Sequence, residues 1–266
     1  MQDFVHLHVH TQYSLLDGQA SVSRLVDKAM KDGMKGIAVT DHGNMFGIKE
    51  FTNYVNKKNS GPKGEIKDLK KRIAGIESGE IECEDKEAEI ADCRAKMAEA
   101  ESKLFKPIVG CEMYVARRTM DKKEDQSGYH LIVLAKNEKG YHNLIKLVSH
   151  AWTRGYYMRP RTDRSELEKY HEGLIVCSAC IGGEVPKKII NDQLEEAEEA
   201  VRWYKNLFGD DYYLELQRHK ATVPRANHEA YPLQQKANAK LLELARKYDI
   251  KVICSNDVHF VDEENA

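Results

Sequence analysis

The sequence predicts an α/β fold whose strands run parallel, as in (β/α) barrels. Residues 4–11 (FVHLHVHT) and 35–45 (KGIAVTDHGNM) have the composition of strands, and residues 21–34 between them have that of a helix, so together they make a βαβ unit. The apolar run at 37–39 is continuous, as expected for a parallel strand buried on both faces. A chain of 266 residues suits one barrel or two ordinary domains, so length alone leaves the domain count open.

The remaining segments continue this alternation. Further strands are predicted at residues 106–116, 128–137, 173–180, 210–220 and 251–260, and further helices at 45–58, 140–152, 193–209 and 232–249. Several of the strands carry polar side chains at one end. In parallel α/β barrels the carboxyl ends of the strands meet at the mouth where the chemistry takes place, so we expect these side chains to lie close together.

Residues 61–104 differ in kind from the rest of the chain. Glu, Lys, Asp and Ala dominate this segment, and apolar residues recur at spacings of three and four from Ile66 to Ile76 and again further on. The pattern predicts two short helices in an antiparallel hairpin. We therefore expect a barrel of residues 1–60 and 105–266 with an inserted charged hairpin, which is either a solvated arm or an arm that docks a partner.

The composition excludes several classes of protein. The net charge of -2 and the pI near 6.6 provide no global basic field, so any contact with nucleic acid must be a local patch. No apolar run is long enough to span a membrane, and we expect a cytoplasmic protein with no membrane partner. The six cysteines are scattered along the chain, and we expect them to be reduced thiols. Cys177 and Cys180 form a C-x-x-C pattern, but a redox motif needs a helix after it, and here a Gly-Gly turn follows.

The stretch HLHVHTQYSLLDG near the N-terminus has the pattern of a metal site. Alternate side chains of a strand point the same way, so His8 and His10 share a face, and the following turn brings Asp17 back towards them. Imidazole and carboxylate together suit zinc, manganese or iron. The alternative is a buried strand with satisfied core histidines.

Other strand ends supply partners for this motif. The full set of candidate metal ligands is His8, His10, Asp17, His42, Glu112, His130, Cys180, Asp257 and His259. If the strands are parallel and close into a barrel, these groups face one mouth, and they are too many for one ion and sufficient for two or three. Neighbouring divalent ions are the usual device for cleaving phosphate esters, and Glu112 is placed to bridge two of them.

A local basic and aromatic cluster occupies residues 153–167. Its tyrosines and arginines are of the kind that stack bases and hold phosphates, although a surface loop has the same composition. On the predicted strand at 210–220, Glu215, Gln217 and His219 share one face. The candidate phosphate or DNA contacts are Arg159, Arg161 and His219.

Six stretches in order along the chain resemble a known family. They are HLHVHTQYSLLDG, GIAVTDHGNMFG, KPIVGCEMYV, HLIVLAKNEKGYHNL, LIVCSACIGGEV and VICSNDVHF. Together they resemble the PHP (polymerase and histidinol phosphatase) domain at the N-terminus of bacterial replicative DNA polymerase III alpha subunits. The resemblance covers nearly the whole chain except residues 61 to about 105, and YSLLDG, TDHGN and NDVHF are typical of the polymerase branch.

The resemblance implies a distorted (β/α)7 barrel, related to the TIM barrel, that binds up to three zinc-like or manganese-like ions. It implies ligand sets of His8, His10, Glu112 and Asp257 for one ion, Glu112, His130 and Cys180 for a second, and Asp17, His42 and His259 for a third. Some polymerase members have lost several of these ligands together with nuclease activity. This sequence keeps all nine, so we expect a live site. The sequence departs from the family at Lys220, where related chains commonly have Gly.

The resemblance also implies function and partners. We expect a metal-dependent phosphoesterase acting as a 3′ to 5′ exonuclease on the DNA 3′ end, within a DNA-directed DNA polymerase whose polymerising site and final barrel helix lie beyond residue 266. Its expected partners are the downstream polymerase domains, a proofreading subunit and other replisome subunits. The alternatives are a metal-stabilised structural module of the polymerase without its own activity, and a stand-alone phosphatase of small substrates.

Overall fold

The computed structural model describes residues 4–123, 128–222, 228–262 and 264. The strands of its sheet are β1 (Gly36–Val39), β2 (Lys106–Val115), β3 (Tyr129–Ala135), β4 (Arg161–Thr162), β5 (Leu174–Cys177), β6 (Tyr212–Gln217) and β7 (Lys251–Ser255). The helices are α1 (Val22–Lys31), α2 (Ile48–Lys58), α3 (Ser60–Ser78), α4 (Lys86–Ser102), α5 (Glu138–Thr153), α6 (Arg164–Tyr170), α7 (Glu184–Ile190), α8 (Leu194–Phe208) and α9 (Ala230–Tyr248), with a 3-10 turn at Gly209–Asp211. No helix in these described ranges is long and apolar enough to cross a membrane.

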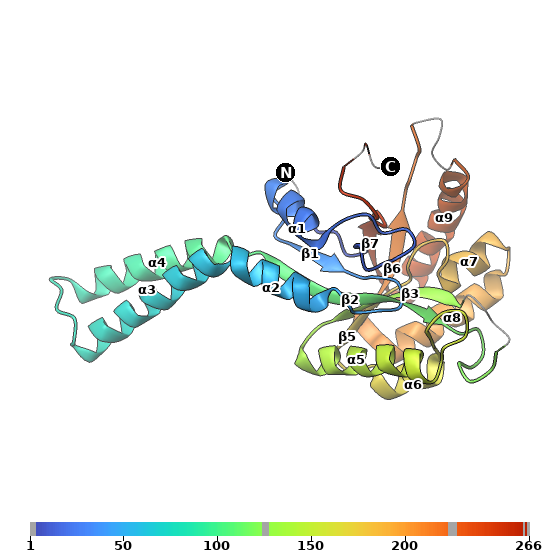
Figure 1. The fold of residues 1–266 in the computed structure, drawn as a ribbon, viewed down its shortest axis with the longest axis horizontal. Coiled ribbons are helices and arrows are strands. Elements are labelled where there is room, and N and C mark those ends of the chain that lie inside the picture. The colour runs from blue at the N-terminus through green and yellow to red at the C-terminus, as the bar shows by residue number, and fades with distance from the viewer. Residues whose placement is uncertain (1–3, 124–127, 223–227, 263, 265–266) are drawn as a thin grey trace.

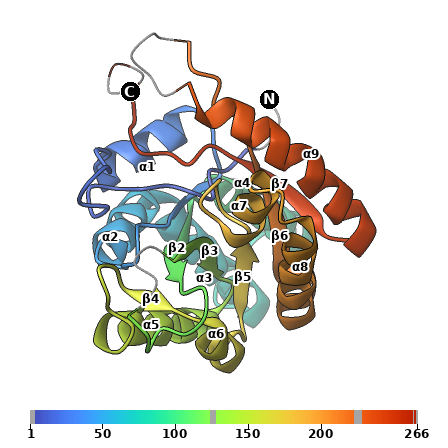
Figure 2. The same cartoon turned by 90° about the vertical axis from the view of Figure 1, so that its right-hand side faces the viewer.

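The sheet curls into a distorted barrel with helices on its outside, which confirms the predicted α/β class (Figures 1 and 2). Its strand order is β1-β2-β3-β5-β6-β7, and the short β4 pairs with β2 off this path. The expectation that all strands are parallel is wrong for β3, which runs antiparallel to both β2 and β5. The described residues between β2 and β3 form no helix, and antiparallel neighbours need none, whereas parallel neighbours need a crossover.

The N-terminal segment closes the curled sheet without forming a regular strand. We expected a strand at residues 4–11, but only one residue of it, Val9, makes a ladder bridge, with Val258. On one side the backbone N–H of Ala38 donates to the carbonyl of His6 at 2.9 Å. On the other side the N–H of His10 donates to the carbonyl of Val258 at 2.7 Å. Residues 6–10 therefore lie between β1 and the segment that follows β7.

The inside of the barrel has an apolar floor and a polar mouth. Alternation along the strands puts Ile108 and Glu112 on the same face of β2, and Leu134 and His130 on the same face of β3. The floor is a buried cluster that includes Ala38, Ile132, Leu134, Cys177 and Ala179. The larger apolar core lies outside the sheet, where α5, α7, α8 and α9 pack against it. Glu112 and His130 thus lie together at one end of the barrel interior, beyond the apolar floor.

Helices α3 and α4 form a hairpin that projects from the barrel (Figure 1). Its own core is small and includes Ile76, Cys93 and Ala100. Its base is fastened by buried Asn59, whose side-chain N–H donates to the carbonyl of Phe105 at 2.8 Å and whose side-chain oxygen accepts from the N–H of Phe105 at 2.9 Å. This clamp joins the chain where it enters the hairpin to the chain where it leaves, one or two residues from the predicted boundaries.

Candidate metal centre

All nine candidate ligands of the sequence analysis lie at the mouth of the barrel. His8, His10 and Asp17 come from the N-terminal segment and its turn, and His42 and Glu112 come from β1 and β2 or just beyond. Cys180 follows β5, and Asp257 and His259 follow β7. His130 is at the amino end of β3, contrary to the expectation of carboxyl ends throughout. Because β3 runs backwards, its amino end lies at the same mouth.

The first group of ligand atoms belongs to His8, His10 and Asp257, and these atoms lie within 4.8 Å of one another. Nε2 of His8 lies 3.1 Å from Oδ1 of Asp257, and Nε2 of His10 lies 3.3 Å from the same oxygen. Asp257 adopts a positive φ of 49°, a conformation that a non-glycine residue takes only when its surroundings hold it there. Two imidazoles and a carboxylate therefore converge on one point.

The second group belongs to Glu112, His130 and Cys180. Nδ1 of His130 lies 2.8 Å from Oε1 of Glu112, and Sγ of Cys180 lies 3.5 Å from the same nitrogen. Oε1 of Glu112 is also 3.3 Å from Nε2 of His8, which belongs to the first group. The fully buried Glu112 carboxylate therefore sits between the two groups, as a bridging ligand would.

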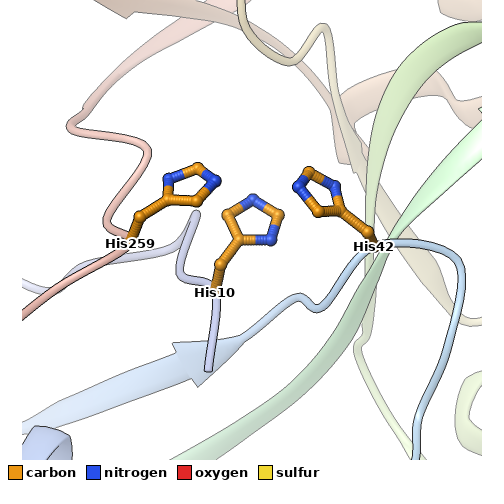
Figure 3. A group of neighbouring side chains, drawn as sticks. All are labelled: His10, His42 and His259. Carbon is orange, nitrogen blue, oxygen red and sulfur yellow. The ribbon is translucent and has the colours of Figure 1, made fainter. Parts of the chain in front are cut away.

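The third group consists of His10, His42 and His259, whose rings face one another (Figure 3). The ring of His10 has its centroid 4.0 Å from that of His42 and 4.3 Å from that of His259. Oδ2 of Asp17 lies 3.3 Å from Nε2 of His42 and 3.9 Å from Nε2 of His259, at the exposed edge of the cluster. His10 is thus shared between the first and third groups.

Four buried atoms at the mouth face one another without hydrogen-bond geometry. Among the described residues, Nε2 of His8, Nε2 of His10, Oε1 of Glu112 and Oδ1 of Asp257 have no hydrogen-bond partner. Burying polar atoms without partners is unfavourable, and a shared divalent cation would satisfy all four at once. The donor set of imidazole, carboxylate and thiol suits zinc, manganese or iron, so the residues present fit the expected ions.

The ionisation of the cluster follows from its crowding. Burial lowers the pKa of His8, but the carboxylates of Asp257 and Glu215 outweigh burial and raise it well above the ordinary value. Burial raises the pKa of Glu112, but His130 and the neighbouring imidazoles outweigh burial and bring it well below its usual range. The raised pKa of His8 and the lowered pKa of Glu112 both favour the charged forms of these two groups, and a divalent cation would take over the role of the imidazolium in compensating the buried carboxylate.

The sequence analysis missed the residues that orient these ligands. Oε1 of Glu215 lies 2.8 Å from Nδ1 of His8, and the Gln217 side-chain N–H donates to Oε1 of Glu215 at 3.0 Å. Nδ1 of His10 lies 3.0 Å from the Ser14 hydroxyl, which donates to Asp41 at 2.8 Å. These partners turn Nε2 of both histidines to the mouth, as outer partners of metal-ligating histidines do. The shared face of Glu215 and Gln217 was the signal for the first pair.

The three candidate phosphate contacts have different surroundings. Arg159 is exposed at the rim, where its guanidinium lies 4.8 Å from the ring centroid of Tyr114 and donates to the Tyr114 hydroxyl. His219 lines a cavity of about 470 Å³ together with Asp257 and His259, and burial lowers its pKa.

The expectation that Arg161 contacts phosphate or DNA is wrong. It is only 1% exposed, and its guanidinium donates to the carbonyls of Gly155, Lys122 and Met120. This side chain is bound inside the protein and does not face the mouth.

Fold and site together define a PHP-type barrel with a cluster of metal-ligating side chains. The PHP domain family model matches residues 6–219, and the chain belongs to this family. Over 99% of its length the chain is 40% identical to DNA polymerase III subunit alpha of Borreliella burgdorferi and 36% identical to that of Aquifex aeolicus. The chain spans only about a fifth of these relatives, at 18% and 19% of their length. The resemblance drawn from the sequence is confirmed.

One solved structure is similar along most of the chain. It is a proposed metal-dependent phosphoesterase of Bifidobacterium adolescentis, 15% identical, with a TM-score of 0.47, and the match covers 97% of this chain and 88% of that one. At this level of similarity it carries no argument about this site.

Proposed function

We propose that this chain is the PHP domain of a replicative DNA polymerase III alpha subunit, that it binds two or three divalent ions, zinc, manganese or iron, and that it cleaves phosphodiester bonds at a DNA 3′ end as a 3′ to 5′ proofreading exonuclease. The observation that carries the proposal is that buried ligand atoms of His8, His10, Glu112 and Asp257 converge at one mouth and have no hydrogen-bond partner among the described residues. The polymerising activity of the parent protein, a DNA-directed DNA polymerase, is proposed to lie outside these residues.

The chain's own residues have separate roles in this proposal. Bound ions supply Lewis acidity and lower the pKa of water, so the protein need not provide a nucleophile. Glu112, fully buried between two ligand groups, would serve as a ligand to ions in both. Asp17 is half exposed at the outer edge of the cluster, where it would complete the ligand set of His42 and His259. Arg159 at the rim is placed to hold a phosphate of the strand.

A second candidate is a metal-stabilised structural module that docks against the polymerase or a proofreading subunit. The observation that favours it is the depth of the cluster, because His8, His10 and Glu112 are at most 1% exposed. A stand-alone phosphatase fits less well, since the relatives at 36 to 40% identity are about five times longer than this chain.

The test is release of nucleotides from single-stranded or mispaired DNA with a 3′-hydroxyl, by the full-length parent protein with zinc or manganese. We expect His10→Ala and Asp257→Ala to abolish release, because each removes a ligand of the first group while leaving the apolar floor intact. The matched controls are His142→Ala on α5 and Asp68→Ala on α3, which remove the same side chains from exposed positions.

Two outcomes would contradict the nuclease. Equal release by the wild type and by both mouth variants would assign the activity to a contaminant. No release at full metal occupancy, together with a higher unfolding midpoint when metal is bound, would favour the structural module.

A further inference from the structure

A row of exposed aromatic side chains lies beside the metal-ligand cluster. Phe46, Trp152 and Tyr156 are 58%, 41% and 52% exposed. The ring centroids of Phe46 and Trp152 are 5.8 Å apart, and those of Trp152 and Tyr156 are 5.5 Å apart with an interplanar angle of 22°. We call these three residues the aromatic row. Contiguous exposed apolar surface on a soluble domain usually marks a binding site.

The aromatic row is fixed to the mouth by a hydrogen bond. The indole N–H of Trp152 donates to the carbonyl of Gly43 at 2.8 Å, and Gly43 directly follows His42. Gly43 has a φ of +61°, and a Cβ there would lie 2.6 Å from Cγ of Pro160. The aromatic row is therefore held directly beside His42, one of the candidate ligands.

Arg159 provides a positive charge close in sequence to Tyr156, which is at one end of the aromatic row. Tyr156 and Arg159 belong to a tight turn closed by a hydrogen bond from the N–H of Tyr157 to the carbonyl of Arg159. The exposed Arg159 side chain packs on Tyr114, whose ring centroid is 6.1 Å from that of His42. Stacked rings and a guanidinium therefore both lie next to the ligand cluster, through Gly43 and Tyr114 respectively.

We propose that the aromatic row is a stacking platform for bases of single-stranded DNA, and that it positions the 3′-terminal phosphodiester at the mouth. Aromatic faces stack on bases of any sequence, and an adjacent guanidinium pairs with the phosphates. A proofreading site must accept any unpaired 3′ end, which suits recognition through ring faces. This inference rests on the proposed function and names the form of its substrate.

The combination of exposed rings and a cation outside the carboxylate-rich mouth favours single-stranded DNA over a protein partner. The inside of the mouth is rich in carboxylates that would repel a polyanion, so a strand needs attachment outside it, with a cation at the rim. The aromatic row and Arg159 supply these two elements on one side of the mouth.

The platform can be tested by binding alone. The probe is a fluorescent ten-nucleotide oligothymidylate with cleavage-resistant phosphorothioate linkages, and its affinity for the 266-residue protein is measured by anisotropy in the presence of manganese. We expect Tyr156→Ala and Phe46→Ala each to weaken binding at least about fivefold, since each removes a stacking face. Tyr141→Ala, an exposed aromatic at the other end of α5, is the matched control and should bind as the wild type.

An abasic strand of the same length and linkages separates stacking from charge. We expect it to bind the wild type, Tyr156→Ala and Phe46→Ala equally, because it has no bases to stack. If the variants bind oligothymidylate as the wild type does, if their loss is as large on the abasic strand, or if the wild type binds no single strand, the platform is refuted. Variants that keep DNA binding but lose a protein partner would also refute it.

A small substrate keeps this result apart from the proposed nuclease. Hydrolysis of the p-nitrophenyl ester of thymidine 5′-monophosphate depends on the mouth and needs no neighbouring bases. Hydrolysis of this ester by the wild type, together with weaker binding of oligothymidylate by Tyr156→Ala, supports both proposals. Absence of hydrolysis in the wild type, with the expected binding losses, removes the nuclease and keeps the platform.

Discussion

The mouth of the barrel and the α3–α4 hairpin are both rich in charged residues, but these residues are buried at the mouth and exposed to solvent on the hairpin. At the mouth, His8, His10 and Glu112 are at most 1% exposed and have ligand atoms without hydrogen-bond partners in the described structure. On the hairpin, ion pairs such as Arg72 with Glu89 lie in solvent, with the two side chains 50% and 35% exposed. Similar residue types therefore have different energetic consequences in the two places.

Burial is what separates them. An exposed ion pair contributes little to stability, because water already solvates both partners and salt screens them. A buried carboxylate or imidazole loses its hydration and must be compensated by a partner or a ligand. The hairpin can therefore lose a charge with little effect, whereas the mouth depends on every group in it.

The largest expected effect is on metal binding, when the charge of one glutamate is removed at the mouth, and the same change on the hairpin is its control. Glu112→Gln should lower the number of bound zinc or manganese ions and abolish the metal-dependent rise in unfolding midpoint, because Glu112 lies between two ligand groups. Glu89→Gln should change neither. Metal content by elemental analysis and a thermal melt with and without chelator check this. Unchanged metal content in Glu112→Gln would remove Glu112 from the ligand set.

A smaller effect is expected for a buried carboxylate whose partners all belong to the protein. Asp163 is 3% exposed, caps α6 through the N–H of Glu166 at 3.1 Å, and accepts the N–H of Met120 at 2.9 Å. Asp163→Ala should lower the free energy of unfolding by about 2 kcal/mol, from the lost cap and the unpaired Met120 N–H. Urea unfolding checks this, with Asp163→Asn as a control that keeps an acceptor. A loss unchanged by adding metal would show that this site is independent of the mouth.

The same carboxylate gives a pH dependence of known sign. Burial raises the pKa of Asp163, but hydrogen bonds from the N–H of Met120 and from Ser165 outweigh it, so the pKa is lowered on folding. A pKa that is lower in the folded state contributes stability above the unfolded value, about 3.9, and this stability is lost as the pH falls through the folded value. The difference between the wild type and Asp163→Ala should therefore shrink below about pH 4.

The smallest effect on folding and metal content is expected from deleting the hairpin. Replacing residues 61–104 with a short Gly/Ser linker should leave the barrel folded and its metal content unchanged, because the Asn59–Phe105 clamp already holds the two ends together. Circular dichroism and metal analysis check this. Loss of folding or of metal would show that the hairpin is part of the barrel core and that the boundary is wrong.

Much of the site follows from local rules that the sequence displays. The two-residue period of a strand places His8 beside His10, and polar residues after buried runs mark His42 and Asp257. These rules hold even where the regular strand does not form, as at residues 6–10, because the extended backbone keeps the same alternation.

The remainder depends on tertiary structure. The direction of β3 is visible only in its pairing with β2 and β5, because its apolar residues alternate in the same way in either direction. The burial of Arg161 depends on carbonyls of Gly155, Lys122 and Met120, which composition does not reveal. The role of Glu215 depends on its contact with His8, which is distant in the sequence, so the sequence around Glu215 does not reveal it.

The bridge between Val9 and Val258 has a consequence for synthesis of the protein. A ribosome releases His8 and His10 well before Asp257 and His259, so the nascent chain carries the early residues of the cluster before the later ones exist. Closing a contact over such a sequence separation makes folding slow compared with local pairing. During that interval a metal ion would meet the early histidines without their later partners, and the full set of candidate ligands exists only after β7 and the residues that follow it have been made.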